Sequence, residues 1–205
     1  MSMKNVPDIV VGRLPLYLRA LSFLAEEGRQ VTSSQELGRK LGISPAQIRK
    51  DLSFFGEFGK QGTGYDIKYL SEQLRRILKV TEEREVALIG AGDLGRALVH
   101  YEGFAGKGFR IALVFDSNPQ KIGQTIGPFE VLDSESIETI VADRGIEVAI
   151  VAVPASAAQE VVDALVRAGV RAILNYAPIT VKVPAGVQVQ YIDPVIHLQR
   201  MTYYL

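Results

Sequence analysis

Two kinds of apolar spacing divide this chain. Up to about residue 80, apolar residues recur every three or four positions, the period of a helix that faces a core. The predicted helices cover residues 7–27 (interrupted by Pro15, or starting near Leu14), 33–41, 44–55 and 69–80. From residue 84, continuous apolar runs alternate with helical segments, as in a parallel sheet buried on both faces. Predicted strands cover 86–89, 111–115, 148–153, 172–174 and 187–192, and predicted helices 94–101, 134–143, 156–168 and 195–205.

Two of the early helices are capped in a characteristic way. Each begins at a serine, Ser33 or Ser44, that is followed three residues later by Glu or Gln, a pair that caps a helix N-terminus. Pro45 occupies the first helical position of the later helix. Gly42 ends the earlier one, so a short turn joins two capped helices, which is typical of a helix-turn-helix. We therefore interpret residues 44–55 as a recognition helix.

The recognition helix presents residue types that read bases or hold phosphates. We expect DNA contacts from Ser44, Gln47, Arg49, Lys50 and Ser53. Four glycines within residues 56–64 predict a hairpin tip, or wing, from which Lys60 and Gln61 reach the DNA. Residues 29–79 carry ten basic against five acidic side chains, the sign expected for a polyanion partner. The alternatives are a helix whose charges are solvated and a plain exposed loop; on the DNA interpretation, residues 1–80 form a winged helix-turn-helix domain.

A glycine-rich loop follows the first predicted strand of the second region. Its residues are Gly90, Ala91, Gly92, Asp93, Leu94 and Gly95, between a strand and a helix, as in a dinucleotide-binding fingerprint. Gly90 makes the turn, Gly92 admits the pyrophosphate, and Gly95 allows close packing of helix on strand. Asp116 ends the second strand, where a carboxylate binds ribose hydroxyls and favours NAD(H) over NADP(H). Residues 84–192 are thus predicted to form a Rossmann-type doubly wound parallel sheet, an α/β domain; a vestigial empty pocket is the alternative.

Further candidates lie at the carboxyl ends of later strands, where such sheets bind ligands. They are Val153 and Pro154, and the run Asn175, Tyr176, Ala177 and Pro178, which we expect at the nicotinamide end; ordinary turn chemistry explains them equally well. Asp193 and Pro194 open a strongly apolar terminal helix. Such a helix packs either on its own domain or in the partner of a homodimer.

Composition narrows the class of protein. The chain has 205 residues, enough for two small domains, with 47% hydrophobic and 22% charged residues, as in ordinary globular proteins. It contains no Cys, which excludes disulfides and zinc–thiolate sites, and we expect no metal site. No signal peptide and no apolar run of about 20 residues is recognisable. The expectation is a cytoplasmic protein without a membrane partner.

Together these motifs resemble the Rex family of redox-sensing transcriptional repressors. The resemblance spans essentially the whole chain and is carried by residues 49–56 (RKDLSFFG), 62–65 (GTGY), the GAGDLG loop with Tyr101 and Gly103-Phe104, and residues 174–178 (LNYAP). It implies a homodimer that represses transcription from an inverted-repeat operator, and that releases the DNA when NADH is bound, whereas NAD⁺ permits the DNA-bound state or competes for it. It also implies that the C-terminal helix, residues 193–205, is swapped into the partner subunit.

The resemblance assigns roles to single residues. Arg19 and Asp193 match a charge pair that links the DNA and nucleotide domains, and Tyr101 matches a tyrosine that follows the redox state of the nicotinamide. Arg49, Lys50 and Lys60 match DNA contacts. Two residues depart from the pattern. Asp93 places a carboxylate beside the pyrophosphate, which is expected to weaken binding, and Pro194 replaces an aromatic that in one known form fills the partner's nicotinamide pocket.

The competing hypothesis is an NAD-dependent oxidoreductase with an appended DNA-binding domain. That activity requires a substrate domain and a proton-transfer group beside the nicotinamide. Only about 30 residues follow Asn175, and the only histidines are His100 and His197, both assigned here to structural or exposed positions. We therefore expect that the chain is not an enzyme. A third hypothesis, a DNA-binding protein that responds to NADP(H), is disfavoured by Asp116.

Overall fold

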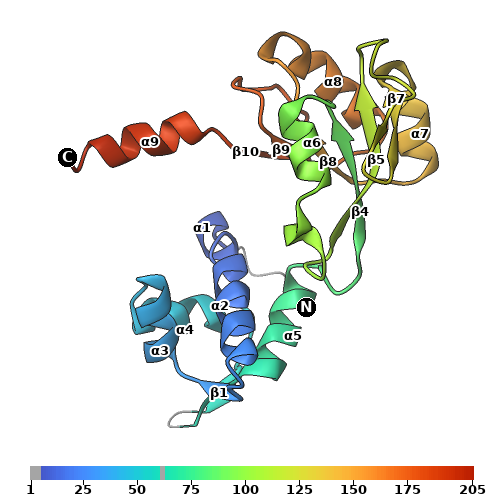
Figure 1. Ribbon diagram of the computed structural model, residues 1–205. Helices are drawn as coiled ribbons and strands as arrows, with labels where there is room; N and C mark the ends of the chain where they lie inside the picture. The colour runs from blue at the N-terminus through green and yellow to red at the C-terminus, as the bar shows by residue number, and fades with distance from the viewer. Residues whose placement is uncertain (1–5, 61–62) are drawn as a thin grey trace. The chain divides into compact units, whose positions relative to one another are not determined.

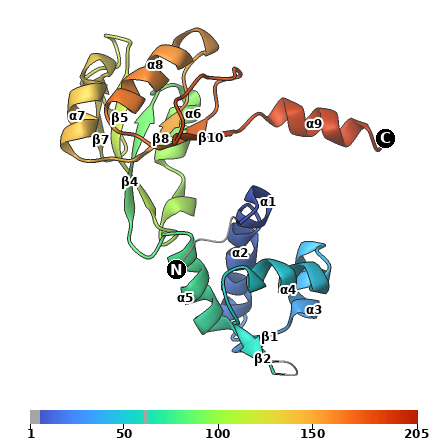
Figure 2. The same ribbon diagram turned by 180° about the vertical axis from the view of Figure 1, so that it is seen from behind.

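The chain divides between Glu82 and Glu83 into two units, each with its own core (Figure 1). The computed structural model describes residues 6–60 and 63–205, with Lys60 described by its backbone alone. In both views, the first unit is mainly helical and the second is built on a sheet (Figure 2).

The first unit combines a helical core with a small antiparallel sheet. Its helices are α1 (Asp8–Val11), α2 (Leu14–Glu26), α3 (Ser34–Leu41), α4 (Pro45–Ser53) and α5 (Ile67–Ile77). The strands β1 (Val31–Thr32), β2 (Gly59–Lys60) and β3 (Gly64–Asp66) pair in the order β1-β3-β2. The hairpin of β2 and β3 follows α4 directly, so this unit has the arrangement of a winged helix-turn-helix, as predicted.

The core of this unit explains which helices form. Its fully buried side chains come from α2, α3, α4 and α5, and include Leu14, Tyr17, Leu21, Leu24, Leu37, Ile48, Leu70 and Leu74. Residues 7–27 form two helices rather than one, separated at Gly12 and Arg13, and the longer of them, α2, starts at Leu14, as one of the two predicted possibilities had it. Pro15 does not break α2: it lies in the first turn, where a missing N–H costs no hydrogen bond.

A seven-stranded sheet forms the second unit. The strands are β4 (Arg84–Ile89), β5 (Phe109–Asp116), β6 (Thr125–Ile126), β7 (Phe129–Asp133), β8 (Val148–Val151), β9 (Ala172–Asn175) and β10 (Gln188–Tyr191). Their order is β10-β9-β8-β4-β5-β7-β6, and every neighbouring pair is parallel except β6 with β7. The chain runs outward from β4 through β5 to β7, then returns to β8 beside β4. The sheet therefore switches direction between β4 and β8, the place where open α/β sheets bind ligands.

Helices cover both faces of this sheet, which confirms the doubly wound α/β prediction. On one face, α7 (Ile137–Asp143) and α8 (Ala155–Arg167) pack on Ala87, Ile89 and Phe115. On the other, Leu98 of α6 (Asp93–Val99) packs with Leu88 and Val114. Two 3₁₀ turns, η1 (Glu102–Phe104) and η2 (Ser134–Ser136), complete the loops.

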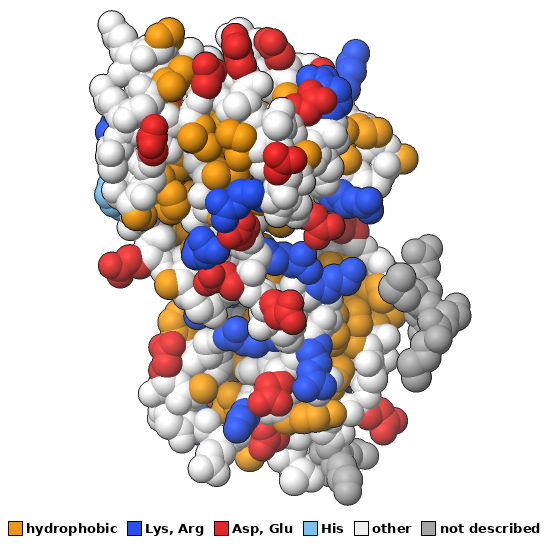
Figure 3. Space-filling view, turned by 90° about the vertical axis from the view of Figure 1, so that its right-hand side faces the viewer, with side chains coloured by type: hydrophobic (Ala, Val, Ile, Leu, Met, Phe, Trp, Pro, Cys, Tyr) orange, Lys and Arg blue, Asp and Glu red, His pale blue; other side chains and the backbone are white. Residues whose placement is uncertain are grey.

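Three elements were not anticipated: the two-residue strand β1 and the hairpin of β6 and β7. The last helix, α9 (Pro194–Thr202), begins at Asp193 as predicted and buries none of its residues. Among the described residues, no helix has the length and apolarity to span a membrane. On the face drawn in Figure 3, Lys and Arg side chains of both units are interspersed with Asp and Glu.

Candidate functional site

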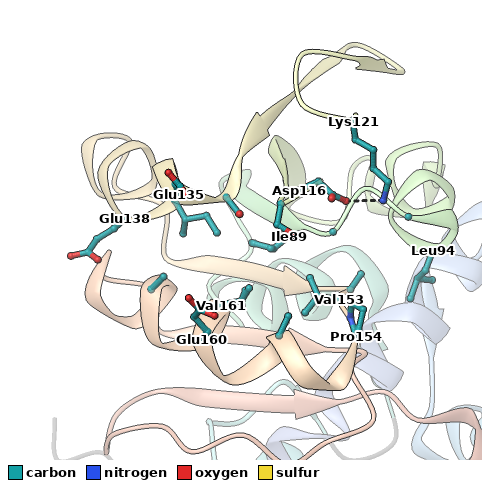
Figure 4. A pocket seen from close by; sticks show the side chains of 18 of the residues that line it. Ile89, Leu94, Asp116, Lys121, Glu135, Glu138, Val153, Pro154, Glu160 and Val161 are labelled. Carbon is teal, nitrogen blue, oxygen red and sulfur yellow. Dashed lines mark hydrogen bonds and ion pairs between the residues drawn. The ribbon is translucent and has the colours of Figure 1, made fainter. Parts of the chain in front are cut away.

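A cleft of about 830 Å³ opens where β4 and β8 end. This volume lies within the range of small-molecule sites. Seven of the residues predicted from the sequence line it: Gly90, Gly92, Asp93, Leu94, Asp116, Val153 and Pro154 (Figure 4). They come from the ends of three strands and the start of α6, so the sheet brings them together as the motif predicts.

The three glycines of the loop have different surroundings. Gly90 has φ +106°, and a Cβ there would collide with the carbonyl oxygen of Ala152. A Cβ on Gly95 would collide with the carbonyl oxygen of Gly90, so α6 can approach the loop only through glycine. A Cβ on Gly92 would meet no atom within 4 Å, and its φ of −79° is open to other residues. Protein packing thus accounts for Gly90 and Gly95, whereas at Gly92 the space is left open toward the cleft.

Asp116 faces the cleft as a hydrogen-bonded carboxylate. Its Oδ2 accepts from Ala91 N at 2.8 Å and from Lys121 Nζ at 3.0 Å, and its Oδ1 accepts from Asn118 N at 2.8 Å. Burial raises the pKa of Asp116, but these hydrogen bonds and the charge of Lys121 outweigh it and hold the pKa below its ordinary value. The group is therefore ionised at neutral pH. Lys121 was missed by the sequence analysis; its signal is a lysine five residues after the acid, just beyond the Asp-Ser-Asn-Pro segment.

The far end of the cleft is acidic with an apolar floor. Glu135, Glu138 and Glu160 gather at the end away from Leu94 and Pro154 in Figure 4. Ile137, Ala157, Val161 and Ala164 also line the cleft. A flat apolar ring is compatible with this floor. Arg167 also lines the cleft, and its Nε donates to Glu138 Oε2 at 2.8 Å.

The remaining nucleotide candidates do not line the cleft. Ala91 and Gly95 are buried beneath the loop. Asn175 is 1% exposed, and its side chain closes its own loop: Nδ2 donates to the carbonyl oxygens of Ala177 and Ile179, and Oδ1 accepts from Ala177 N. The Asn175 side chain therefore stabilises the conformation of residues 175–179.

Tyr101 lies beside that loop. It is 59% exposed and packs edge-on against Phe104, with ring centroids 5.2 Å apart. Gly103 makes room for the ring, because a Cβ there would collide with it. The pKa of Tyr176 is raised, first by burial and then by the nearby phenol of Tyr101. Tyr101 and Tyr176 of the loop of Asn175 to Pro178, predicted separately, thus lie close enough to interact electrostatically.

The predicted DNA-binding residues of α4 are mostly exposed. Arg49, Lys50 and Ser53 are exposed, with Arg49 Nη1 donating to Ser34 Oγ at 3.0 Å and Ser53 Oγ donating to the carbonyl oxygen of Lys50 at 2.7 Å. Ser44 is exposed and caps α4 by accepting from Gln47 N at 3.2 Å. The side chain of Lys60 is not described, and Gln61 lies outside the described residues.

Gln47 is not fully exposed as expected. It is half-buried, and its Nε2 donates to Oδ1 of Asp51 at 2.6 Å, one turn along α4. The physical reason is the i, i+4 spacing, which places the two side chains on the same flank of the helix. Asp51 itself was missed as a functional candidate, although it occupies an inward position between Ile48 and Leu52.

The two residues of the expected charge pair lie in different units. Arg19 is exposed on α2. Asp193 caps α9, with Oδ1 accepting from Val195 N at 2.9 Å.

Comparisons with known proteins agree with this arrangement. Residues 81–179 match a family described as "CoA binding domain", and residues 5–53 match "Putative DNA-binding protein N-terminus". A "Redox-sensing transcriptional repressor Rex" of Roseiflexus sp. strain RS-1 is 55% identical over 99% of this chain and 92% of the relative. A relative of the same name from Brevibacillus brevis is 45% identical over 98% of each chain.

Solved structures point the same way. That of RSP in complex with β-NAD⁺ and operator DNA has a TM-score of 0.92 and 38% identity, and covers 98% of this chain and 93% of RSP. The complex of RSP with β-NADH has a TM-score of 0.88 and 36% identity, with 98% and 94% covered. The curated relatives are named as transcriptional repressors and not as enzymes, which disfavours the oxidoreductase hypothesis. With this identity over nearly its whole length, the chain belongs to the Rex family of redox-sensing transcriptional repressors.

Proposed function

We propose that this chain binds an inverted-repeat operator as a homodimer, represses transcription there, and releases the DNA when NADH is bound. One observation carries the proposal: a capped helix pair with exposed Arg49 and Lys50 lies on the same chain as a glycine-loop cleft that ends at an ionised Asp116. A DNA-binding helix alone would indicate a DNA-binding protein that does not respond to a nucleotide. A nucleotide site alone would indicate a nucleotide-binding protein that does not bind DNA.

The DNA half of the proposal rests on α4. Helix-turn-helix proteins place the N-terminal part of the second helix against base edges, and flanking groups hold the phosphates. Arg49 and Lys50 are exposed on α4, with Ser44 at its start and Ser53 at its end. Two copies related by a two-fold axis read two half-sites of opposite direction, which is an inverted repeat.

The dimer is favoured by α9. Its exposed large apolar residues are Val195, Ile196, Leu198 and Met201, followed by Tyr203, Tyr204 and Leu205. A contiguous apolar surface of this kind marks an interaction site. We propose that α9 is swapped into the partner subunit, with Asp193 at its start set against Arg19 of an N-terminal domain.

The nucleotide half rests on the fit of the cleft to the adenosine and pyrophosphate groups of NAD(H). Gly92 leaves open space where a phosphate approaches, and the N-terminus of α6 directs N–H groups toward it. Asp116 accepts hydrogen bonds from the ribose hydroxyls. RSP, a relative, has been solved with β-NADH and with β-NAD⁺ and operator DNA, which supports the same ligands here.

Redox sensing requires contacts with the nicotinamide ring itself. A ligand shifts a conformational equilibrium only by its differential affinity for the two states. The oxidised and reduced rings differ in charge and planarity. We propose that Tyr101 and the loop of residues 175–178 contact this ring, because the phenol of Tyr101 influences Tyr176 and the loop follows β9, the strand next to β8. Because a repressor acts on chromosomal DNA, we also propose that the chain works in the cytoplasm.

The test is fluorescence anisotropy of a labelled duplex that carries the operator DNA of the RSP complex, with NADH titrated in at fixed NAD⁺. The chain contains no Trp, so the fluorescence of NADH can be followed in parallel. Tight binding that NADH abolishes supports the proposal. Binding that is indifferent to NADH contradicts the redox switch. Bound NADH without binding to the operator duplex, or to any duplex selected from a randomised pool, contradicts the repressor function and restores the oxidoreductase hypothesis.

A further inference from the structure

Asp51 is a buried carboxylate on the inner face of the recognition helix. Its side chain is 0% exposed, in a helix turn whose other inward residues, Ile48 and Leu52, belong to the apolar core. Because an ion in such a place is strongly destabilising unless it is paired, its partners reveal what the position does.

Four hydrogen bonds satisfy the Asp51 carboxylate. Arg13 donates from Nε to Oδ2 at 2.6 Å and from Nη2 to Oδ1 at 2.8 Å, and Tyr17 donates its hydroxyl to Oδ2 at 2.5 Å. Gln47 completes the set through Nε2 to Oδ1 at 2.6 Å. Arg13 is the N-cap residue of α2 and Tyr17 lies in its first turn, so the cluster joins the start of α2 to the second turn of α4.

Stability alone does not account for this cluster. A buried ion pair can often be replaced by well-packed apolar side chains of similar volume without loss of stability. Buried polar groups are instead useful where one geometry must be selected over others. Leucine or methionine could fill the positions of Arg13, Tyr17 and Asp51. We therefore infer that these residues serve to fix the position of α4 and of its side chains.

The group that Asp51 orients is Gln47. An ionised carboxylate can only accept hydrogen bonds, so it fixes which end of the Gln47 amide faces it. Nε2 points to Asp51, and the amide oxygen is turned away from it. Gln47 is the third residue of α4, near the helix end that contacts bases in helix-turn-helix proteins.

We propose that Asp51, held by Arg13 and Tyr17, is a positioning residue for base recognition: it fixes the Gln47 amide so that its oxygen accepts from a base. The base is one with an amino group in the major groove, adenine at N6 or cytosine at N4. This proposal rests on the proposed binding of operator DNA by α4. It makes Asp51, which contacts no DNA, a determinant of sequence preference.

The experiment measures discrimination between bases. Binding is compared for the operator duplex of the RSP complex and for duplexes that each carry one changed base pair in both half-sites. The wild-type chain is expected to lose roughly 5- to 100-fold in affinity at the base pair that Gln47 reads. Gln47→Met, which keeps the side-chain size but removes the amide, and Asp51→Asn are each expected to abolish that difference at the same base pair.

The double variant Gln47→Met with Asp51→Asn separates positioning from a structural role. If Asp51 acts through Gln47, the double variant discriminates no worse than Gln47→Met alone. Tyr17→Phe is the matched control, since it removes one hydrogen bond to Asp51 and leaves the Asp51–Gln47 contact. Tyr17→Phe is expected to lower thermal stability and to retain base discrimination.

Several results would overturn the proposal. The first is unchanged base discrimination in Gln47→Met, and the second is retained base discrimination in folded Asp51→Asn. The third is a further loss of DNA affinity, equal at every base pair, when Asp51→Asn is added to Gln47→Met. Should Asp51→Asn not fold, the pair Arg13→Met with Asp51→Leu replaces the ion pair by apolar side chains and removes the acceptor of Gln47. That pair must then lose discrimination at the same base pair.

Failure of this proposal and failure of the proposed function give different results. A wild-type chain that prefers the operator but is not released by NADH contradicts the redox switch and leaves the base-preference results valid. If the wild-type chain has no preference for the RSP operator, discrimination is measured on a duplex that it selects from a randomised pool. The absence of any selected sequence overturns both proposals.

Discussion

Lys121 Nζ lies 3.0 Å from Oδ2 of Asp116, so the acid predicted to hold a ribose already carries its own cation. The pair lies at the cleft, with the Lys121 side chain 30% exposed. A bare carboxylate repels a 2′-phosphate, whereas one paired with a lysine repels it less. We therefore propose that two residues of opposite effect set the preference for NADH over NADPH.

Asp116→Ala is expected to weaken NADH binding by about tenfold, the cost of losing hydrogen bonds to a charged group, and to narrow the NADH/NADPH preference. Lys121→Met is expected to widen the preference, because the carboxylate is left unpaired. Dissociation constants for both nucleotides, measured by NADH and NADPH fluorescence, test the pair. Asp116→Asn keeps the size of the side chain. If the ratio of the NADH and NADPH dissociation constants is unchanged in all three variants, neither Asp116 nor Lys121 selects the nucleotide.

Gly92 and Gly95 are expected to respond differently to alanine. Gly92→Ala introduces a methyl group into open space, so thermal stability should be unchanged while NADH binding weakens by about 1–3 kcal/mol from overpacking against the pyrophosphate. Gly95→Ala forces a methyl group against the Gly90 carbonyl and should lower the melting temperature itself. Calorimetry and NADH titration of the two variants check this, and full NADH affinity in Gly92→Ala would contradict the placement of the pyrophosphate.

Acid should weaken the first unit through Asp51. Burial raises the pKa of Asp51, but hydrogen bonds from Arg13, Tyr17 and Gln47 and the charge of Arg13 bring it below the ordinary value of 3.8. A carboxyl whose pKa is lower in the folded state stabilises fully above its ordinary pKa, and this stabilisation is lost as the pH falls through the folded pKa. Asp51→Asn should therefore cost about 3 kcal/mol at neutral pH.

The measurement is the free energy of unfolding of the wild type and Asp51→Asn from urea titrations at a series of pH values. The difference between the two proteins should be constant above pH 3.8 and shrink below it. If the difference in unfolding free energy stays constant at every pH, protonation of the Asp51 carboxylate does not cause the loss of stability in acid.

Arg49→Ala and Lys50→Ala are expected to weaken operator binding by about 1–3 kcal/mol and to leave NADH affinity unchanged. Removing a side chain that holds a phosphate also lowers the slope of log affinity against log salt concentration by about one. Removing a side chain that reads a base relaxes sequence specificity instead. Anisotropy titrations at several salt concentrations distinguish the two roles. Arg171→Ala, an exposed basic residue of the second unit, serves as the control. Wild-type DNA affinity in both variants would contradict the assignment of α4.

Elements with a long pattern could be predicted from the sequence alone. The capped helices α3 and α4 and the runs of β4, β5, β8 and β9 each carry several agreeing signals, and they form within a few residues of the predicted bounds. Strand β1 and the β6–β7 hairpin were missed because their side chains alternate over too few residues to show a period. The break at Gly12 was missed because the apolar spacing of α2 continues into α1.

The candidate site divides along a similar line. The glycine loop and Asp116 are local in sequence, so their spacing predicted the cleft they line. Two partners of Asp51, Tyr17 and Arg13, are by contrast 34 and 38 residues away, and no local pattern signals them. The same holds for Tyr101 and Tyr176, which adjoin only because β4 and β9 flank β8 in the sheet.

The rigid fit of Gly95 against Gly90 has a consequence for what the protein measures. Packing and the hydrogen bond from Ala91 N to Asp116 hold the loop in shape without a ligand. On the proposed mode of binding, the adenosine and pyrophosphate groups, which both redox forms share, therefore contribute equally to the two dissociation constants. Equal contributions cancel in the ratio of two dissociation constants. On this proposal, the NADH/NAD⁺ ratio at which the sensor switches depends on the nicotinamide end alone, and the loop determines only the total nucleotide concentration that the sensor needs.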